Sequence, residues 1–167
     1  DLSDNCLASL PPLPSKALRS VNISGNAIVL LDFPSRDSAG GSSAGDNSAI
    51  QGGGGSRPAF SKLKEWNASR NRIVGIAAAF FQQCSKLERL DVSHNALEDL
   101  VGNVALLTKV QHLDVSHNRI SSLPPELGGC KALQTVLATH NQLSSVPEAL
   151  LDNGVLSRLR LEGNPAM

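Results

Sequence analysis

Asparagine recurs in one sequence frame along the whole chain, at positions 5, 26, 71, 95, 118, 141 and 164. The intervals between these positions are 21, 45, 24, 23, 23 and 23 residues. Apolar residues recur at fixed offsets from each asparagine, and the five letters DVSHN occur twice, at residues 91–95 and 114–118. A period of this length indicates a stack of similar units rather than one compact core.

The repeated unit reads L-x-x-L-x-L-x-x-N-x-L-x-x-L. Alternation at its centre predicts a short strand in which every second side chain points inward. The asparagine amide can bond backbone groups that the following turn leaves unpaired. Because one unit cannot bury its apolar face alone, neighbouring units must stack. Around Asn95 the apolar positions are Leu87, Leu90, Val92, Leu97 and Leu100.

This pattern resembles that of the leucine-rich repeat family, and about seven copies cover nearly the whole chain. The period and the segments LPPEL (123–127) and VPEAL (146–150) are similar to the typical intracellular class, of the Ras-group and leucine-rich repeat-containing protein 40 type. The resemblance implies an α/β solenoid arc. A parallel sheet is expected on its concave side, with short helices, 3₁₀ turns or extended segments on its convex side. Proline in both segments should end the inner strand and begin the outer, convex segment of the repeat.

The interval between Asn26 and Asn71 equals one unit plus 22 residues. The extra residues lie in a Gly- and Ser-rich segment at 35–58, in which Ile50 is the only large apolar side chain. This composition cannot bury enough surface to offset the entropy of ordering, so we expect a flexible insertion in the convex part of a repeat. The expected organisation is repeats 1–2 at residues 1–34, the insertion at 35–58, and repeats 3–7 at 59–167 of one solenoid domain.

The composition disfavours several classes of partner. The chain has 15 basic and 15 acidic residues, so its total charge predicts no attraction to nucleic acid or an anionic membrane. No run of 18 apolar residues is present. Cys6, Cys84 and Cys130 form no CxxC pair, and we interpret them as structural thiols in a reducing compartment. The N-x-S sequons at Asn22 and Asn67 lie on expected strands and have no meaning in a cytosolic protein.

Side chains between the inward positions should face the concave side. They mix both charges with hydroxyl and imidazole groups, which suits the binding of another protein. The candidate partner-binding residues are Glu65, Asn67, Ser69, Arg89, Asp91, Ser93, His94, His112, Asp114, Ser116, His117, Thr135, Thr139, His140, Arg158 and Arg160.

The DVSHN motif admits one catalytic and one metal-binding interpretation. The side chains of Asp91, Ser93 and His94 are those of a hydrolase triad, but residues two apart on a strand lie about 6–7 Å apart, and the set recurs in the next unit without a pocket. His94, His117 and His140 should form a ladder, but a collinear row with no Cys or carboxylate to complete a tetrahedron disfavours a metal. We therefore expect no enzyme activity, metal or cofactor.

The leading hypothesis is a scaffold or adaptor module in the cytoplasm, which binds a protein partner on its concave face in signalling or complex assembly. Nucleic acid, membrane and small-molecule substrates are not expected. Two alternatives stay open. The chain could be a fragment of a receptor ectodomain, which only the two sequons support. It could also be the repeat domain of a larger enzyme or regulatory subunit.

Overall fold

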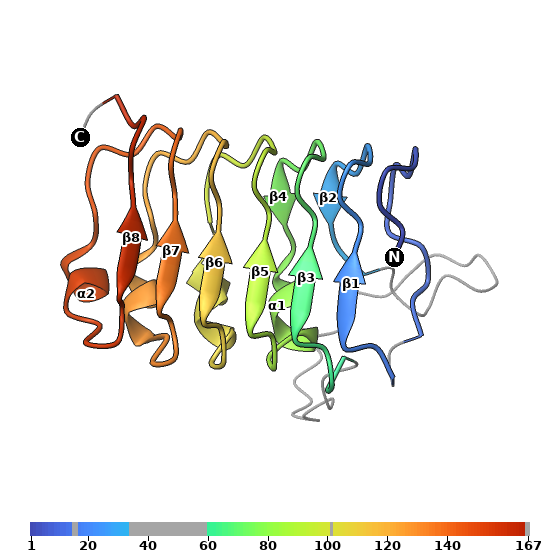
Figure 1. Cartoon of the computed structure of the whole chain (residues 1–167), viewed down its shortest axis with the longest axis horizontal. Coiled ribbons are helices and arrows are strands. Elements are labelled where there is room, and N and C mark those ends of the chain that lie inside the picture. Colours follow the sequence, from blue (N-terminus) through green and yellow to red (C-terminus); the bar gives the residue numbers. More distant parts are fainter. Residues whose placement is uncertain (15–16, 34–59, 101, 166–167) are drawn as a thin grey trace, which may run out of the picture.

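The computed structural model describes residues 1–14, 17–33, 60–100 and 102–165. Its main feature is a six-stranded parallel sheet in the order β1-β3-β5-β6-β7-β8 (Figure 1). The predicted insertion at 35–58 lies outside the described residues. The strands of the sheet are β1 (Ser20–Asn22), β3 (Glu65–Asn67), β5 (Arg89–Asp91), β6 (His112–Asp114), β7 (Thr135–Leu137) and β8 (Arg158–Arg160).

The register of the sheet follows the sequence repeat. Val21 lies opposite Trp66, Leu90 opposite Leu113, and Val136 opposite Leu159. Each strand therefore places equivalent repeat positions side by side. A shift by one residue would turn the central apolar side chain of a strand from the core to solvent, so burial fixes this register.

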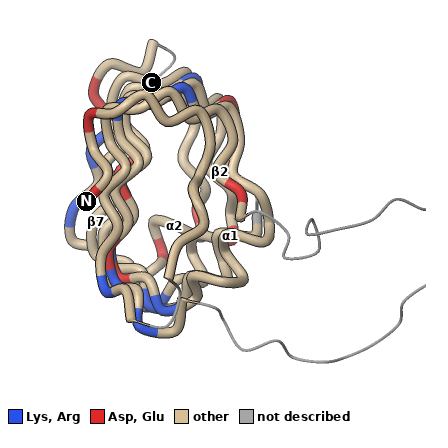
Figure 2. Tube along the Cα trace, turned by 90° about the vertical axis from the view of Figure 1, so that its right-hand side faces the viewer, with Lys and Arg blue, Asp and Glu red and all other residues tan. Residues whose placement is uncertain are grey.

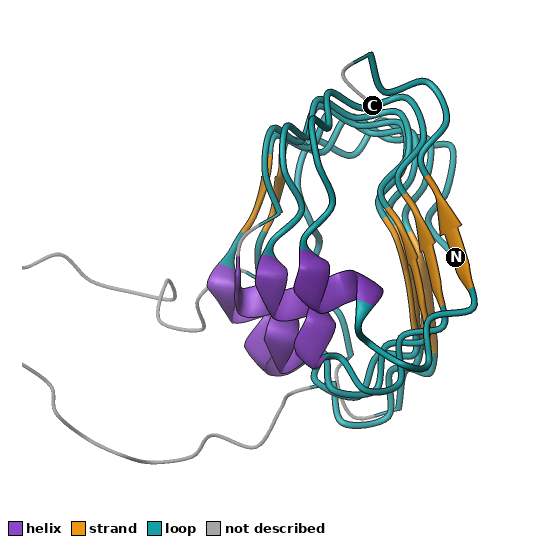
Figure 3. Ribbon diagram, turned by 90° about the vertical axis from the view of Figure 1, so that its left-hand side faces the viewer, coloured by secondary structure: helices purple, strands orange, loops and turns teal. Residues whose placement is uncertain are grey.

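The opposite side of the solenoid carries short elements of several kinds, as Figure 3 shows. A two-stranded parallel sheet, β2 (Leu30–Leu31) and β4 (Gly75–Ile76), is followed by α1 (Ala78–Gln83), the 3₁₀ helices η1 (Gly102–Leu106) and η2 (Pro125–Gly129), and α2 (Glu148–Leu151). Viewed along the array, the repeats superimpose as an elongated ring (Figure 2). The predicted α/β solenoid is confirmed.

The prolines act where the sequence predicted. Pro124 and Pro147 have extended backbone angles and lie immediately before η2 and α2. Proline fixes φ near the value that a helix start needs and supplies no N–H, so it ends the preceding extended segment and favours a helical turn after it.

The core is a continuous column of the predicted apolar positions. In the central units these side chains are almost completely buried, whereas Leu156, Leu159 and Leu161 of the last unit are only partly buried. No described repeat packs against the outer side of β8. Burial of each layer therefore depends on its two neighbours.

Asparagine side chains connect neighbouring repeats. The Asn118 Nδ2 group donates to the carbonyl oxygens of Val92 (3.0 Å), Val115 (3.0 Å) and Ser116 (3.2 Å), and its Oδ1 accepts from the Leu97 N–H (3.0 Å). One side chain thus bonds backbone groups of its own repeat and of the preceding one. The same bridge is made by Asn26, Asn71, Asn95, Asn141 and Asn164.

All five aromatic residues of the chain gather in one cluster, and two of them flank residues 34–59 in the sequence. The rings of Phe33 and Phe60 stack with centroids 4.7 Å apart, Trp66 meets Phe80 edge-on at 5.1 Å, and Phe80 meets Phe81 at 5.6 Å. Phe33 and Phe60 are the described residues on either side of that segment. Because these two residues touch and β1 pairs directly with β3, the sheet runs uninterrupted past this point.

The cysteines form no disulfide, and two of them are part of the core. Cys84 and Cys130 are fully buried, while Cys6 is exposed. Burial raises the pKa of the Cys84 thiol to about 12 and raises that of Cys130 as well. Both thiols are therefore protonated at neutral pH and unreactive, in agreement with a structural role. None of the described helices is long and apolar enough to cross a membrane.

We expect Asn118→Ala to lower the free energy of unfolding by on the order of 3 kcal/mol. The substitution leaves buried backbone groups without partners, and each such group costs about 1–3 kcal/mol. Urea unfolding followed by circular dichroism measures this loss. Asn103→Ala is the control, because Asn103 is exposed on η1; it should change stability by less than about 0.5 kcal/mol. Equal effects of the two substitutions would contradict the bridging role.

Candidate partner-binding face

The concave side of the main sheet holds a groove with a volume of about 640 Å³. Residues from all six strands line it, so the groove runs along the array. Half of the candidate residues lie in it, namely Glu65, Asn67, Arg89, Asp91, His112, Asp114, Thr135 and Arg158.

Further residues line the groove that were not among the candidates. Ser20, Asn22 and Leu137 stand at the same strand positions as the candidates, in β1 and β7. The repeat frame predicts these positions on the concave side as well. Trp66 and Leu90 also line the groove as central strand residues, although their side chains are buried in the core.

The groove carries charges of both signs. Asp91 and Asp114 lie side by side in its centre. Arg89 Nε lies 3.9 Å from Glu65 Oε1, and both side chains are about 60% exposed (61% and 59%). Exposed pairs of this kind contribute only about 0–1 kcal/mol. Breaking this ion pair so that Arg89 and Glu65 bind a partner instead therefore costs little free energy.

Three candidates are not available to a partner. Ser69, Ser93 and Ser116 were expected on the concave surface, but they are buried, with 9%, 6% and 7% exposure. The reason is that each strand ends at the residue two positions earlier, and the chain turns there. The Asp91 carboxylate Oδ1 accepts hydrogen bonds from the Ser93 N–H (2.9 Å) and hydroxyl (2.7 Å).

This bond explains two letters of the DVSHN motif. The same contact joins Asn22 to Ser24 and Asn67 to Ser69, and the Asp114 carboxylate accepts from the Ser116 N–H. An Asp or Asn two residues before Ser stabilises the turn after the strand. The Asp and Ser side chains of this motif hold the turn and do not form a nucleophile–base arrangement.

The histidines occupy a corner with left-handed backbone rather than a strand. His94, His117 and His140 have φ values of 54°, 54° and 52°. The residue before the repeat asparagine has positive φ in all seven units, which also include Asp4, Gly25, Arg70 and Gly163. The repeat pattern predicts these histidines on the concave strands. That placement was wrong, because the strands end three residues earlier.

The histidine ladder itself is confirmed. The exposed rings of His94 and His117 stack with centroids 4.1 Å apart and planes inclined by 10°, and those of His117 and His140 with 4.4 Å and 17°. In-plane nitrogen lone pairs of parallel rings point alongside one another instead of converging on one ion. Within the described part of the chain no group of three His, Cys, Asp or Glu side chains is placed to hold a metal.

The pKa of His117 is lowered. Desolvation is the largest cause, followed by charge repulsion from His94 and His140, while Asp114 acts in the opposite direction. The stack therefore favours neutral imidazoles in its centre.

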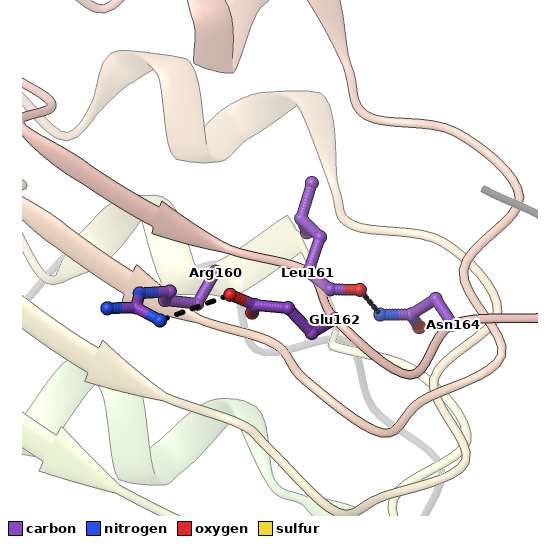
Figure 4. Close-up of polar contacts among 4 residues, drawn as sticks. All are labelled: Arg160, Leu161, Glu162 and Asn164. Atoms are coloured by element: carbon purple, nitrogen blue, oxygen red, sulfur yellow. Dashed lines mark hydrogen bonds and ion pairs between the residues drawn. The ribbon is translucent and has the colours of Figure 1, made fainter.

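The remaining two candidates lie near the end of the sheet. Thr139 is half-buried just after β7, and its carbonyl accepts from the His117 N–H (2.8 Å). The exposed Arg160 binds Glu162 at 3.1 Å (Figure 4). The pKa of Glu162 is lowered, chiefly by a hydrogen bond from its own backbone N–H and further by Arg160. Arg160 is not among the residues that line the groove, although it lies opposite the lining residue Leu137 in the sheet.

Comparison with protein families agrees with the repeat geometry. One model, described as leucine rich repeat, matches residues 61–120, and a second, described as leucine rich repeats in two copies, matches residues 108–153. The chain is a leucine-rich repeat protein. No curated protein sequence matches it. Domains of this family are generally protein-interaction modules and typically lack catalytic activity.

Solved structures share this fold. A leucine-rich repeat protein from Leptospira interrogans matches with a TM-score of 0.69 at 25% identity, over 89% of this chain and 32% of that one. The functional domain of InlJ from Listeria monocytogenes gives 0.65 at 21% identity, over 90% and 26%. The plant peptide hormone receptor RGFR1, in complex with RGF2, gives 0.64 at 26% identity, over 88% and 20%. This leucine-rich repeat chain spans a third or less of each structure's length.

His117→Val should lower the free energy of unfolding by about 1–2 kcal/mol, because a β-branched residue fits the left-handed region poorly. His117→Asn, which also removes the ring but tolerates positive φ, should cost less than about 0.5 kcal/mol. Urea unfolding at pH 7.5 measures both. If Asn and Val were equally damaging, ring stacking and not backbone conformation would be the reason for histidine here.

Stability should also fall on acidification through the histidine range. A lowered pKa in the folded state means that the unfolded chain binds the proton first, near pH ~6.5. The contribution of His117 is therefore fully present above that pH and is lost as the pH falls. Urea midpoints at pH 7.5 and 5.5 should differ more for the unmodified protein than for His117→Asn. An identical difference in both proteins would refute this linkage.

Proposed function

We propose that this leucine-rich repeat chain is a scaffold or adaptor module that binds another protein in the groove of its concave sheet. The single observation that carries the proposal is the groove itself, which has a volume of about 640 Å³ and side chains from six consecutive repeats. A surface of this length with scattered charges suits a protein segment better than a small molecule, which needs an enclosed pocket.

The side chains that line the groove supply recognition without chemistry. Arg89 and Glu65 are exposed, and His112 and Thr135 are half-exposed in neighbouring strands. They offer donors, acceptors and charges at intervals of about 4.8 Å. The Asp91 carboxylate is already bonded by Ser93, so it contributes charge to the groove and not a free catalytic base.

We further propose that the module works in the cytoplasm, in signalling or complex assembly. The three free cysteines support this proposal, because secreted repeat domains are generally stabilised by disulfides. A receptor ectodomain is the second candidate. Its support is the likeness to RGFR1, whose structure was solved with RGF2, together with the sequons at Asn22 and Asn67. In both cases the ligand would be a protein or peptide.

The test places a photo-crosslinking amino acid at Thr135 in the groove or at Gln82, which is exposed on α1. In cells, the Thr135 probe should capture a discrete partner that the Gln82 probe does not. Adding Arg89→Ser, His112→Ser and Arg158→Ser should reduce the capture by about tenfold or more.

The matched control for that triple variant is Arg72→Ser, Arg119→Ser and Gln142→Ser, which changes exposed residues outside the groove. It should leave capture unchanged. Capture of the same partners from Gln82 would move the interaction to the convex side. A glycosidase-sensitive mobility shift that is lost with Asn22→Gln and Asn67→Gln would favour the receptor alternative over the cytoplasmic one.

A further inference from the structure

A second surface lies on the rim where the strands of the main sheet begin. A hollow of about 470 Å³ is found there, outside the concave groove. Figure 2 shows Lys and Arg gathered at this lower end of the cross-section. The residues that line the hollow are Arg19, Ser61, Lys62, Lys64, Lys86, Glu88 and Lys109.

The cations on this rim follow the repeat frame. Lys62, Lys86 and Lys109 each stand nine residues before a repeat asparagine, and Arg19 and Lys64 stand seven before. Glu88 occupies the latter position in the next repeat and pairs with Lys64 at 2.8 Å. Among the described residues that line the hollow, it is the single acid against five cations. A chain without net charge thus carries a local excess of positive charge on this rim.

Among the described residues that line the rim, cationic hydrogen-bond donors outnumber the one carboxylate acceptor, Glu88. Its backbone amides are already used, since the N–H of Lys64 donates to Arg19 (2.8 Å) and the N–H of Glu88 donates to Lys64 (2.7 Å). The Lys64 ammonium already has Glu88 as its partner. The ammonium groups of Lys62, Lys86 and Lys109 form no ion pair with a described residue, and their chemistry favours a partner rich in anionic oxygens. Equivalent side chains of neighbouring repeats lie about 4.8 Å apart along the rim. Side chains on one face of an extended peptide lie about 6–7 Å apart, so both rows repeat on a similar length scale.

We propose that this basic rim binds an acidic segment of a protein partner. The lining favours this ligand over other polyanions. Its described residues include no aromatic side chain on which the bases of single-stranded nucleic acid could stack. They also include no large apolar side chain that could enter a membrane interface. The rim is separate from the concave groove, so the two surfaces can be tested independently.

The test measures the anisotropy of a fluorescein-labelled peptide of alternating Glu and Ser, with a Gln/Ser peptide as its neutral counterpart. The protein should bind the acidic peptide alone, more weakly as salt increases. Lys62→Gln, Lys86→Gln and Lys109→Gln together should weaken binding by about tenfold or more. Lys64 is kept because it pairs with Glu88.

The matched control removes three exposed cations from the other end of the strands, through Arg70→Asn, Arg72→Gln and Arg119→Gln. It changes the net charge equally and should alter the affinity by less than about twofold. Equal weakening by both variants would overturn the proposal, because only total charge would matter. Failure to bind the acidic peptide would also overturn it, including the case in which phosphatidylserine vesicles or an oligothymidylate bind instead. A groove variant such as Arg158→Ser leaves the rim intact and separates this outcome from that of the concave site.

Discussion

Asparagine side chains that bond the backbone of two neighbouring repeats are the interaction on which this array depends. Each turn that follows a strand leaves N–H and C=O groups inside the solenoid, where water cannot reach them. An unpaired buried group costs about 1–3 kcal/mol, so a fold that leaves several per repeat could not form. One amide supplies two donor hydrogens and an acceptor in a fixed plane. Asn118 makes four hydrogen bonds with these groups, and two of the four, to Val92 and from Leu97, cross the repeat boundary.

The turn before that asparagine determines the rest of the repeated letters. After the strand, the chain must leave the extended conformation and change direction within a few residues. It does so through one residue with left-handed backbone angles. Asp91 holds the entry to the turn by bonding Ser93, and His94 takes the positive φ. In DVSHN, Asp ends the strand and Val is buried in the core. Ser stabilises the turn, His takes the left-handed conformation, and Asn bridges two repeats. Its resemblance to a hydrolase site arises because short polar side chains suit both turns and catalysis.

The same geometry generates the two surfaces to which we assign binding. A sheet of three-residue strands exposes two side chains per repeat to the concave side, and stacking places them in rows. Residues that precede the strands form a second set of rows on the rim, where Lys86 and Lys109 follow one another. Each repeat contributes its own surface side chains. A row of like charges therefore arises when the same charged residue type occupies one position in successive repeats. Solenoids therefore change partners without changing their core.

The sequence by itself determined the fold, the frame of the repeats, the buried apolar positions and the bridging role of asparagine, because all of these follow from a local pattern that recurs. It also predicted that Pro124 and Pro147 begin convex segments. Only the tertiary structure decided which polar residues are accessible. Ser93 and Asp91 alternate with apolar residues in the same way, yet Ser93 is buried and Asp91 faces the groove. The strand ends between them, and the place where it ends depends on hydrogen bonds to neighbouring repeats. The contact between Phe33 and Phe60 likewise joins residues that are distant in sequence, and it exists only once the repeats are stacked. The repeat frame predicted the histidine ladder, but the left-handed corner that carries it, outside the strands, follows from the turn in three dimensions.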